Sequence, residues 1–230
     1  MKIAIRGEGP TDMGKVDNGL FVKGPMVTLI EKLDCYKNLY SELGCTYEYN
    51  HIEWEYISKY DIMESPKRRR NMISRGKKAE LVMGTNADIL KGFYNNSESF
   101  AVLAKEKEAD IAIFFVDTDK DSFEDRYKQV SAGLASHDYD KTGVPMIPTK
   151  ISEAWLMCCL SKYENCTDYE NATTDKESPN YPKNICNKDD LDAYIIAENC
   201  DPNKINMPSF NRFRDDFKIA VNSYKYGTCE

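Results

Sequence analysis

A run of six apolar residues, followed at once by alternating aspartates, constrains the fold of this 230-residue chain more than any other feature. The apolar run covers residues 111–116, IAIFFV, and the segment after it is Asp117-Thr118-Asp119-Lys120-Asp121. A short continuous apolar run bounded by polar residues is typical of a strand buried on both faces, as in the middle of a parallel sheet. The sequence therefore predicts a central strand with carboxylates at its carboxyl end.

The rest of the chain alternates strands with helices. Further strands are predicted at residues 3–6, 46–57 and 144–147. Helices are predicted at residues 25–43, 74–94, 97–108 and 122–136, and from Ser152, as a capping residue, to residue 160. This alternation predicts an α/β fold with a mostly parallel four-stranded sheet flanked by helices.

The C-terminal part has a different composition. Residues 161–188 are rich in Asn, Asp, Thr and Pro, and two more helices are predicted after them, at 188–199 and 209–224. We therefore expect an α/β domain at 1–162 and, packed on it, a C-terminal loop and helical extension at 163–230.

Composition limits the class of protein. With 41% hydrophobic residues the chain can bury a full core. No stretch approaches the ~18 consecutive apolar residues of a membrane span, and residues 1–10 lack the apolar stretch of a signal peptide. We expect a cytoplasmic protein with no membrane contact. The eight cysteines show no Cys-x-x-Cys spacing, so we expect reduced structural thiols and no zinc.

Acidic residues follow two of the predicted strands. Glu8 lies just after the first strand, whereas Asp117, Asp119 and Asp121 follow the central one. Ligands of open parallel sheets bind beyond the carboxyl ends of the strands, where such carboxylates can converge. Neighbouring carboxylates repel each other unless a cation lies between them. One aspartate could instead cap the following helix, but three are better explained by a site for Mg²⁺ or Mn²⁺.

The D-x-D-x-D run also resembles a calcium-binding loop, but two key positions differ. Ser122 stands where that loop needs glycine, and Lys128 stands where it needs a bidentate glutamate. We therefore exclude a calcium hand.

Basic residues gather in one short segment, although the net charge is −7. The segment contains no acid, and its basic residues are Lys67, Arg68, Arg69, Arg70, Arg75, Lys77 and Lys78. A local basic strip can follow a phosphate backbone, whereas the alternative is a solvated loop and helix start. Both interpretations remain open, and the neighbouring metal site motivates the first.

Three motifs, in this order, resemble a Toprim domain, the fold shared by topoisomerases, bacterial primases and overcoming-lysogenization-defect (OLD) nucleases. They are EGPTD at residues 8–12, Asp117-x-Asp119, and Glu153 within PTKISEAWL at residues 148–156. More narrowly, the chain is similar to short stand-alone Toprim-like proteins of unknown function, which also share a late Pro-Ser-Phe helix, here at 208–210. The resemblance covers most of the chain.

The resemblance implies roles for individual residues. Glu8 would act as a metal ligand or general acid/base, and Asp117 and Asp119 would hold one or two Mg²⁺ ions. Glu153 would supply a further acidic ligand, unless it only favours the start of its helix. Trp155, at the start of an apolar helix, is expected in the core.

The implied activity is metal-dependent hydrolysis of nucleic-acid phosphodiesters, on DNA rather than RNA, in phage defence or DNA repair. The chain has no phosphate-binding loop of the G-x-x-x-x-G-K-[ST] type, so either an ATPase is a separate subunit or the protein works without one. Two alternatives stay open. One is a catalytically silent Toprim-like subunit that binds an ATPase complex, and the other is a small-molecule phosphotransferase or phosphatase.

Neutralising Arg68, Arg69 and Arg70 tests the basic strip. If these residues contact phosphates, the triple Gln variant should bind DNA more weakly. The log–log slope of affinity against salt should also flatten by about 0.7–0.9 per lost contact. Binding measured across a salt series checks this, and an unchanged slope would assign the segment to a solvated surface.

Overall fold

The computed structural model describes residues 1–7, 11–46, 49–64, 87–119, 121–173, 175–186 and 191–227. The strands are β1 (Lys2–Arg6), β2 (Gly14–Asp17), β3 (Leu20–Lys23), β4 (Glu53–Tyr56), β5 (Ile111–Phe115) and β6 (Gly143–Met146). The helices before β6 are α1 (Pro25–Glu31), α2 (Asp34–Glu42), α3 (Lys59–Glu64), α5 (Ala87–Glu106) and α6 (Phe123–Ala135). Those after β6 are α7 (Glu153–Leu160), α8 (Cys166–Glu170), α9 (Pro182–Ile185), α10 (Leu191–Asn199), the 3-10 turn η1 (Pro202–Lys204) and α11 (Pro208–Gly227).

Four strands form one sheet in the order β4-β1-β5-β6, and every neighbouring pair is parallel. The predicted central strand is β5, which lies between β1 and β6 and is buried along its whole length. The predicted α/β fold with a parallel four-stranded sheet is therefore confirmed.

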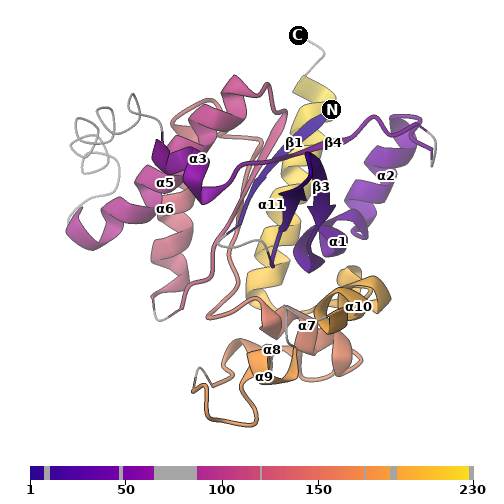
Figure 1. Ribbon diagram of the computed structural model, residues 1–230, viewed down its shortest axis with the longest axis vertical. Coiled ribbons are helices and arrows are strands. Elements are labelled where there is room, and N and C mark those ends of the chain that lie inside the picture. The colour runs from indigo at the N-terminus through magenta and orange to yellow at the C-terminus, as the bar shows by residue number, and fades with distance from the viewer. Residues whose placement is uncertain are drawn as a thin grey trace.

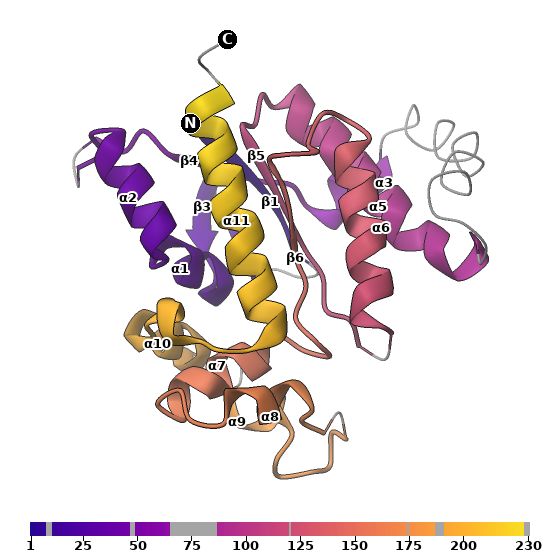
Figure 2. The same ribbon diagram turned by 180° about the vertical axis from the view of Figure 1, so that it is seen from behind.

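Helices cover both faces of the sheet (Figures 1 and 2). Alternate residues of a strand point to opposite faces, so Ile111, Ile113 and Phe115 join the core under α1, α2 and α11. Ala112 and Phe114 join the other core, under α3, α5 and α6. Helices α7–α10 lie beyond the carboxyl end of the strands, at the bottom of both views.

The C-terminal helix α11 is part of one of these layers. Its buried phenylalanines, Phe210, Phe213 and Phe217, belong to the same core as β1 and β5. Trp155 of α7 is fully buried, as expected, and meets the ring of Phe210 edge-on at 4.9 Å between centroids. The α7 start and α11 are thus packed together by aromatic contacts.

Helix α5 is continuous where the sequence suggested a break after residue 94. Ser97 does not cap a new helix, because its hydroxyl donates to the carbonyl of Phe93 at 2.8 Å and lies 3.1 Å from that of Tyr94. A Cβ on Gly133 of α6 would lie 2.0 Å from Ser97 Oγ. The close α5–α6 packing therefore favours one continuous helix, and the predicted residues 74–86 lie outside the described part.

The single helix predicted over 25–43 is instead two helices, α1 and α2. Asn203, far along the chain, satisfies the backbone groups that the break exposes. Its amide nitrogen donates to the carbonyl of Lys32 at 3.3 Å, and its oxygen accepts from the backbone N–H of Asp34 at 3.1 Å. A tertiary contact thus replaces helical hydrogen bonds.

The loop predicted before α1 also contains an unexpected antiparallel hairpin, β2–β3.

The edge strand β6 contains Pro145, which lacks a backbone N–H and so suits an edge position.

Helices α6 and α11, from opposite faces of the sheet, meet across the β6 edge. Tyr127 of α6 donates to Asp216 of α11 at 2.7 Å, and Arg212 of α11 donates to the Tyr127 hydroxyl at 2.9 Å. Burial raises the pKa of Asp216 above its usual range, although Tyr127 and Arg212 act in the opposite direction. This polar cluster holds the two layers together.

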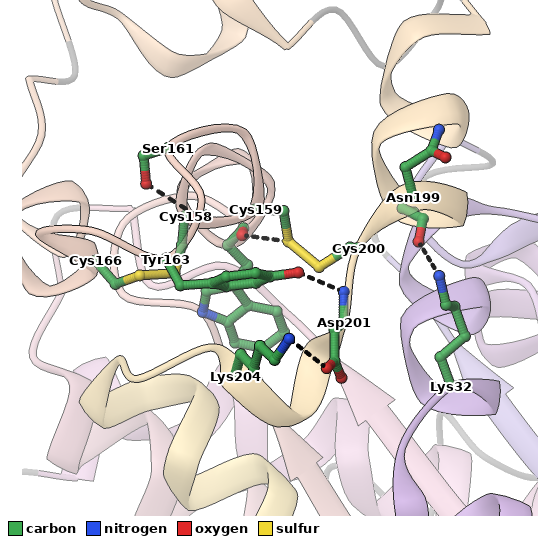
Figure 3. The surroundings of a disulfide bond; sticks show 12 residues. Lys32, Cys158, Cys159, Ser161, Tyr163, Cys166, Asn199, Cys200, Asp201 and Lys204 are labelled. Carbon is green, nitrogen blue, oxygen red and sulfur yellow. Dashed lines mark hydrogen bonds and ion pairs between the residues drawn. A yellow bond between two sulfur atoms is a disulfide. The ribbon is translucent and has the colours of Figure 1, made fainter.

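The expectation of reduced thiols is wrong for four cysteines. Disulfides join Cys158 to Cys166 and Cys159 to Cys200, with Cα atoms 4.8 and 5.4 Å apart (Figure 3). Spacing in sequence could not reveal them, because adjacent residues of one helix pair with two separate segments. Both bridges start from α7 and fasten the region beyond the sheet.

Among the described residues, no helix combines the length and apolar character needed to cross a membrane.

Removing the longer disulfide should destabilise the protein more than removing the shorter one. Cys159–Cys200 spans 41 residues and Cys158–Cys166 spans 8, so loop entropy predicts losses of about 4 and about 2.5 kcal/mol. Cys200→Ala and Cys166→Ala form a matched pair, since both side chains are buried. Urea unfolding without reductant measures the difference, and a larger loss in C166A, or a wild type insensitive to reductant, would contradict it.

Candidate functional site

The segments that carry the predicted acidic residues meet at the carboxyl edge of the sheet. Strands β1, β5 and β6 are parallel neighbours, so the loops after them leave from one edge. The Ser152 hydroxyl, just before α7, donates to Asp12 Oδ1 in the loop after β1 at 3.2 Å. The backbone N–H of Thr118, after β5, donates to the carbonyl of Pro148, after β6, at 3.2 Å. All three motif segments are therefore joined by hydrogen bonds.

Asp119 and Lys150 face each other in the left-handed backbone region, with φ values of 53° and 62°. The backbone N–H of Asp119 donates to the Lys150 carbonyl at 3.1 Å, and that of Lys150 donates to Thr118 Oγ1 at 2.6 Å. Each left-handed residue costs roughly 1 kcal/mol, although aspartate tolerates it better than most. These hydrogen bonds offset that cost and hold the loop in a conformation that local preference does not favour.

The carboxylates at this edge differ in burial. Asp12, Asp117 and Glu153 are only 6%, 5% and 2% exposed, whereas Asp119 and Asp121 are exposed. Buried carboxylates are unfavourable unless hydrogen bonds or cations compensate them. The edge therefore combines a buried acidic part with an exposed one.

Two buried arginines lie beneath these carboxylates. Arg6 of β1 donates to the carbonyl of Phe115 at 3.2 Å. Arg126 of α6 donates to the carbonyl of Asp117 at 3.0 Å and forms an ion pair with Asp121. Their positive charges lie where β5 ends, and they help to balance the acidic groups.

Two lysines also reach this region, and Lys183 is one that the sequence did not indicate. Its Nζ lies 4.0 Å from Glu153 Oε1, while its side chain is 46% exposed. Lys183 belongs to the short helix α9 in the polar stretch 161–188, and no spacing to an acidic motif marks it. Lys150 Nζ donates to the carbonyl of Ala172 at 2.9 Å. It is therefore anchored to the segment after α8.

The residues that the sequence singled out fall into four groups. Asp117, Asp119 and Glu153 lie at the carboxyl edge, as expected for residues that follow β5 and β6. Asp121 contacts Arg126 through its carboxylate. Ser152 precedes α7, but its hydroxyl contacts Asp12 and makes no capping hydrogen bond. Outside the described residues lie Glu8, Lys67, Arg68, Arg69, Arg70, Arg75, Lys77 and Lys78.

The donor chemistry of this edge suits a hard cation. Asp117 and Asp119 offer oxygen ligands, which Mg²⁺ and Mn²⁺ prefer. Within the described ranges, no three His, Cys, Asp or Glu side chains gather closely enough to hold a metal ion. The predicted ligand set also includes Glu8, which lies outside those ranges. The fit therefore rests on the type and position of Asp117 and Asp119.

No protein-family model, no curated protein and no solved structure matches this chain.

Lys150 allows a test of the left-handed conformation in the loop after β6. Lys150→Gly and Lys150→Ala both lose the contact with Ala172, but only glycine adopts positive φ without steric cost. We expect K150G to be more stable than K150A by about 0.5–1 kcal/mol in urea unfolding.

A matched control comes from Lys128, which is exposed in the middle of α6. There the order should reverse, with K128G less stable than K128A by about 1 kcal/mol. The same order at both positions would show that residue 150 does not depend on a left-handed backbone.

Proposed function

We propose that this protein hydrolyses nucleic-acid phosphodiesters with Mg²⁺ or Mn²⁺, as a Toprim-type nuclease related to the OLD family. The observation that carries the proposal is that hydrogen bonds join the three motif segments, with Ser152 bonded to Asp12 and Thr118 bonded to Pro148. These segments meet at the edge of a parallel sheet where ligands of open α/β folds bind. The order of motifs and the fold thus support the same class of site.

Asp117 and Asp119, together with Glu8, would hold the metal. When bound, Mg²⁺ neutralises charge on the phosphate oxygens and activates water for attack on phosphorus. The chain's own residues would supply the rest of the site. Asp119 is exposed and accessible to a substrate, whereas Asp117 is buried beside the backbone that Arg126 holds.

Among the described residues, Lys183 is the proposed cation for a substrate phosphate. It reaches the edge from a separate helix, keeps nearly half of its side chain exposed and lies beside Glu153. An ammonium group in this position would attract a scissile phosphate and orient it toward the carboxylates. Glu153 would then position Lys183, in addition to any role as an acidic ligand.

Duplex or single-stranded DNA is the proposed substrate, and the basic segment 67–78 is the proposed contact to its backbone. A separate ATPase subunit is the proposed partner, because the OLD-type nucleases that the motifs resemble combine a Toprim part with an ATPase part. Cytoplasmic DNA repair or phage defence is the setting that these proposals fit.

A second candidate is a catalytically silent subunit that recognises nucleic acid for such an ATPase. It shares the fold and the basic segment with the first candidate but needs no metal.

Replacing either aspartate with asparagine tests the nuclease. Asp117→Asn and Asp119→Asn should each lower Mn²⁺-dependent cleavage on the order of a hundredfold or more. The fold should be unaffected or slightly stabilised without metal, because like-charge repulsion is relieved. Plasmid and single-stranded cleavage are measured beside melting temperature, and Asp168→Asn, an exposed change in α8, is the charge-matched control.

The outcomes separate the candidates. Cleavage by the wild type alone that both variants lose supports the nuclease, and equal cleavage by all three proteins rejects the assigned residues. Cleavage that requires an added ATPase indicates a two-component enzyme. Binding of DNA without cleavage under either condition supports the silent subunit, and no binding at low salt promotes a small-molecule phosphotransferase.

A further inference from the structure

The side chain of Arg126 is almost entirely buried and only 3% exposed. A buried charge is unfavourable unless nearby acceptors or opposite charges compensate it. Its guanidinium lies over the ring of Phe93 of α5, 3.3 Å from the centroid. The planar group is therefore fixed from one side by an aromatic ring and directed at the loop after β5. This position is set by α5 and α6 together, since Phe93 comes from one helix and Arg126 from the other.

The guanidinium group of Arg126 contacts three groups of that loop. Nη1 donates to the carbonyl of Asp117 at 3.0 Å, Nη2 donates to the carbonyl of Thr118 at 3.3 Å, and Nη2 also pairs with the Asp121 carboxylate. One side chain thus holds both the beginning and the end of the segment that carries the two candidate metal ligands.

The contact with Arg126 indicates a structural role for Asp121, the third aspartate of the D-x-D-x-D run. Its backbone N–H donates to the Thr118 carbonyl at 2.9 Å, and its carboxylate faces the guanidinium. The backbone of Asp121 therefore closes a turn with Thr118, and its side chain fixes this turn to Arg126. This is a different use of the carboxylate from the metal ligation that the alternating sequence pattern suggested.

We infer that Arg126 and Asp121 are positioning residues that set the geometry of Asp117 and Asp119, and that Asp121 is not itself a metal ligand. The inference rests on the proposed metal-dependent function. Mg²⁺ and Mn²⁺ require ligands in a nearly fixed octahedral arrangement, so a loop displaced by a fraction of an ångström loses affinity. A buried ion pair is weak evidence for stability, but it can impose one conformation on a loop.

The test measures Mn²⁺ affinity by electron paramagnetic resonance, which needs no substrate and no turnover. Arg126→Lys keeps the charge but cannot contact both carbonyls and a carboxylate as a planar fork, and Asp121→Ala removes only an exposed carboxylate. Each should weaken Mn²⁺ binding about 10- to 100-fold, the range found for residues that orient metal ligands. Asp119→Asn should abolish binding.

The double variant R126K/D121A separates positioning from ligation. If Asp121 acts only through Arg126, the double variant should bind Mn²⁺ no more weakly than the worse single variant. If Asp121 is a ligand, its removal should weaken binding in the R126K background as much as in the wild type. That additive result would overturn the inference.

Arg214→Lys is the matched control, because Arg214 also donates to two backbone carbonyls, those of Asn203 and Ile205, and to a side-chain oxygen. Its contacts lie in α11 and the segment before it, so Mn²⁺ affinity should be unchanged. Circular dichroism and melting temperature show whether each variant is folded. If R126K unfolds, Asp121→Asn provides the decisive comparison, because its amide oxygen can still accept from Arg126 but is a poorer metal ligand than a carboxylate. Mn²⁺ affinity near that of the wild type then supports positioning, and a loss as large as in D121A overturns the inference.

The failure of this inference is distinguishable from that of the proposed function. If the wild type, R126K and D121A bind Mn²⁺ equally well and D119N does not bind it, the positioning role is rejected. The metal site itself is then supported. A wild type that does not bind Mn²⁺, or D119N that binds as well as the wild type, rejects the metal site and the inference together.

Discussion

The burial of β5 on both of its faces is the constraint on which the rest of the structure depends. Phe115 on one face and Phe114 on the other are both fully buried, so neither face can be left to solvent. Each buried side chain of this size contributes roughly 2–3 kcal/mol, and helices on both sides supply the contacts. The two cores, one under α1, α2 and α11 and one under α3, α5 and α6, follow from that requirement.

The same strand concentrates polar groups at its carboxyl end, where the apolar run stops at Asp117. Backbone carbonyls and carboxylates meet there within a largely buried environment, and the chain compensates them with buried guanidinium groups from Arg6 and Arg126. Both arginines contact phenylalanine rings, so their apolar surfaces join the core while their N–H groups serve the loop. Stability and the arrangement of the candidate site therefore depend on the same contacts.

The region beyond the sheet completes this edge from a distant part of the sequence. Helix α7 carries Glu153 at its first position, Trp155 in the aromatic core, and the two cysteines that bind α8 and the segment before η1. This anchoring keeps α8–α10 beside the carboxyl edge, where Lys183 approaches Glu153. A network from Trp155 Nε1 through Ser209 to the buried carboxylate of Glu170 joins α7, α8 and α11. The C-terminal part is therefore joined to the carboxyl edge by disulfides, hydrogen bonds and aromatic packing.

The sequence by itself determined the elements whose signal is local. The apolar run of β5 and the alternation of strands and helices predicted the parallel α/β sheet, because burial on two faces leaves a continuous pattern. It also placed Asp117, Asp119 and Glu153 after strands that end at one edge. Only the tertiary structure decided the break between α1 and α2, the continuity of α5, the disulfides, the pairing of Asp121 with Arg126 and the approach of Lys183 to Glu153. Most of these features depend on contacts between residues far apart in the chain. The rest depend on how side chains pack and point in the folded protein. A local sequence pattern contains neither kind of information.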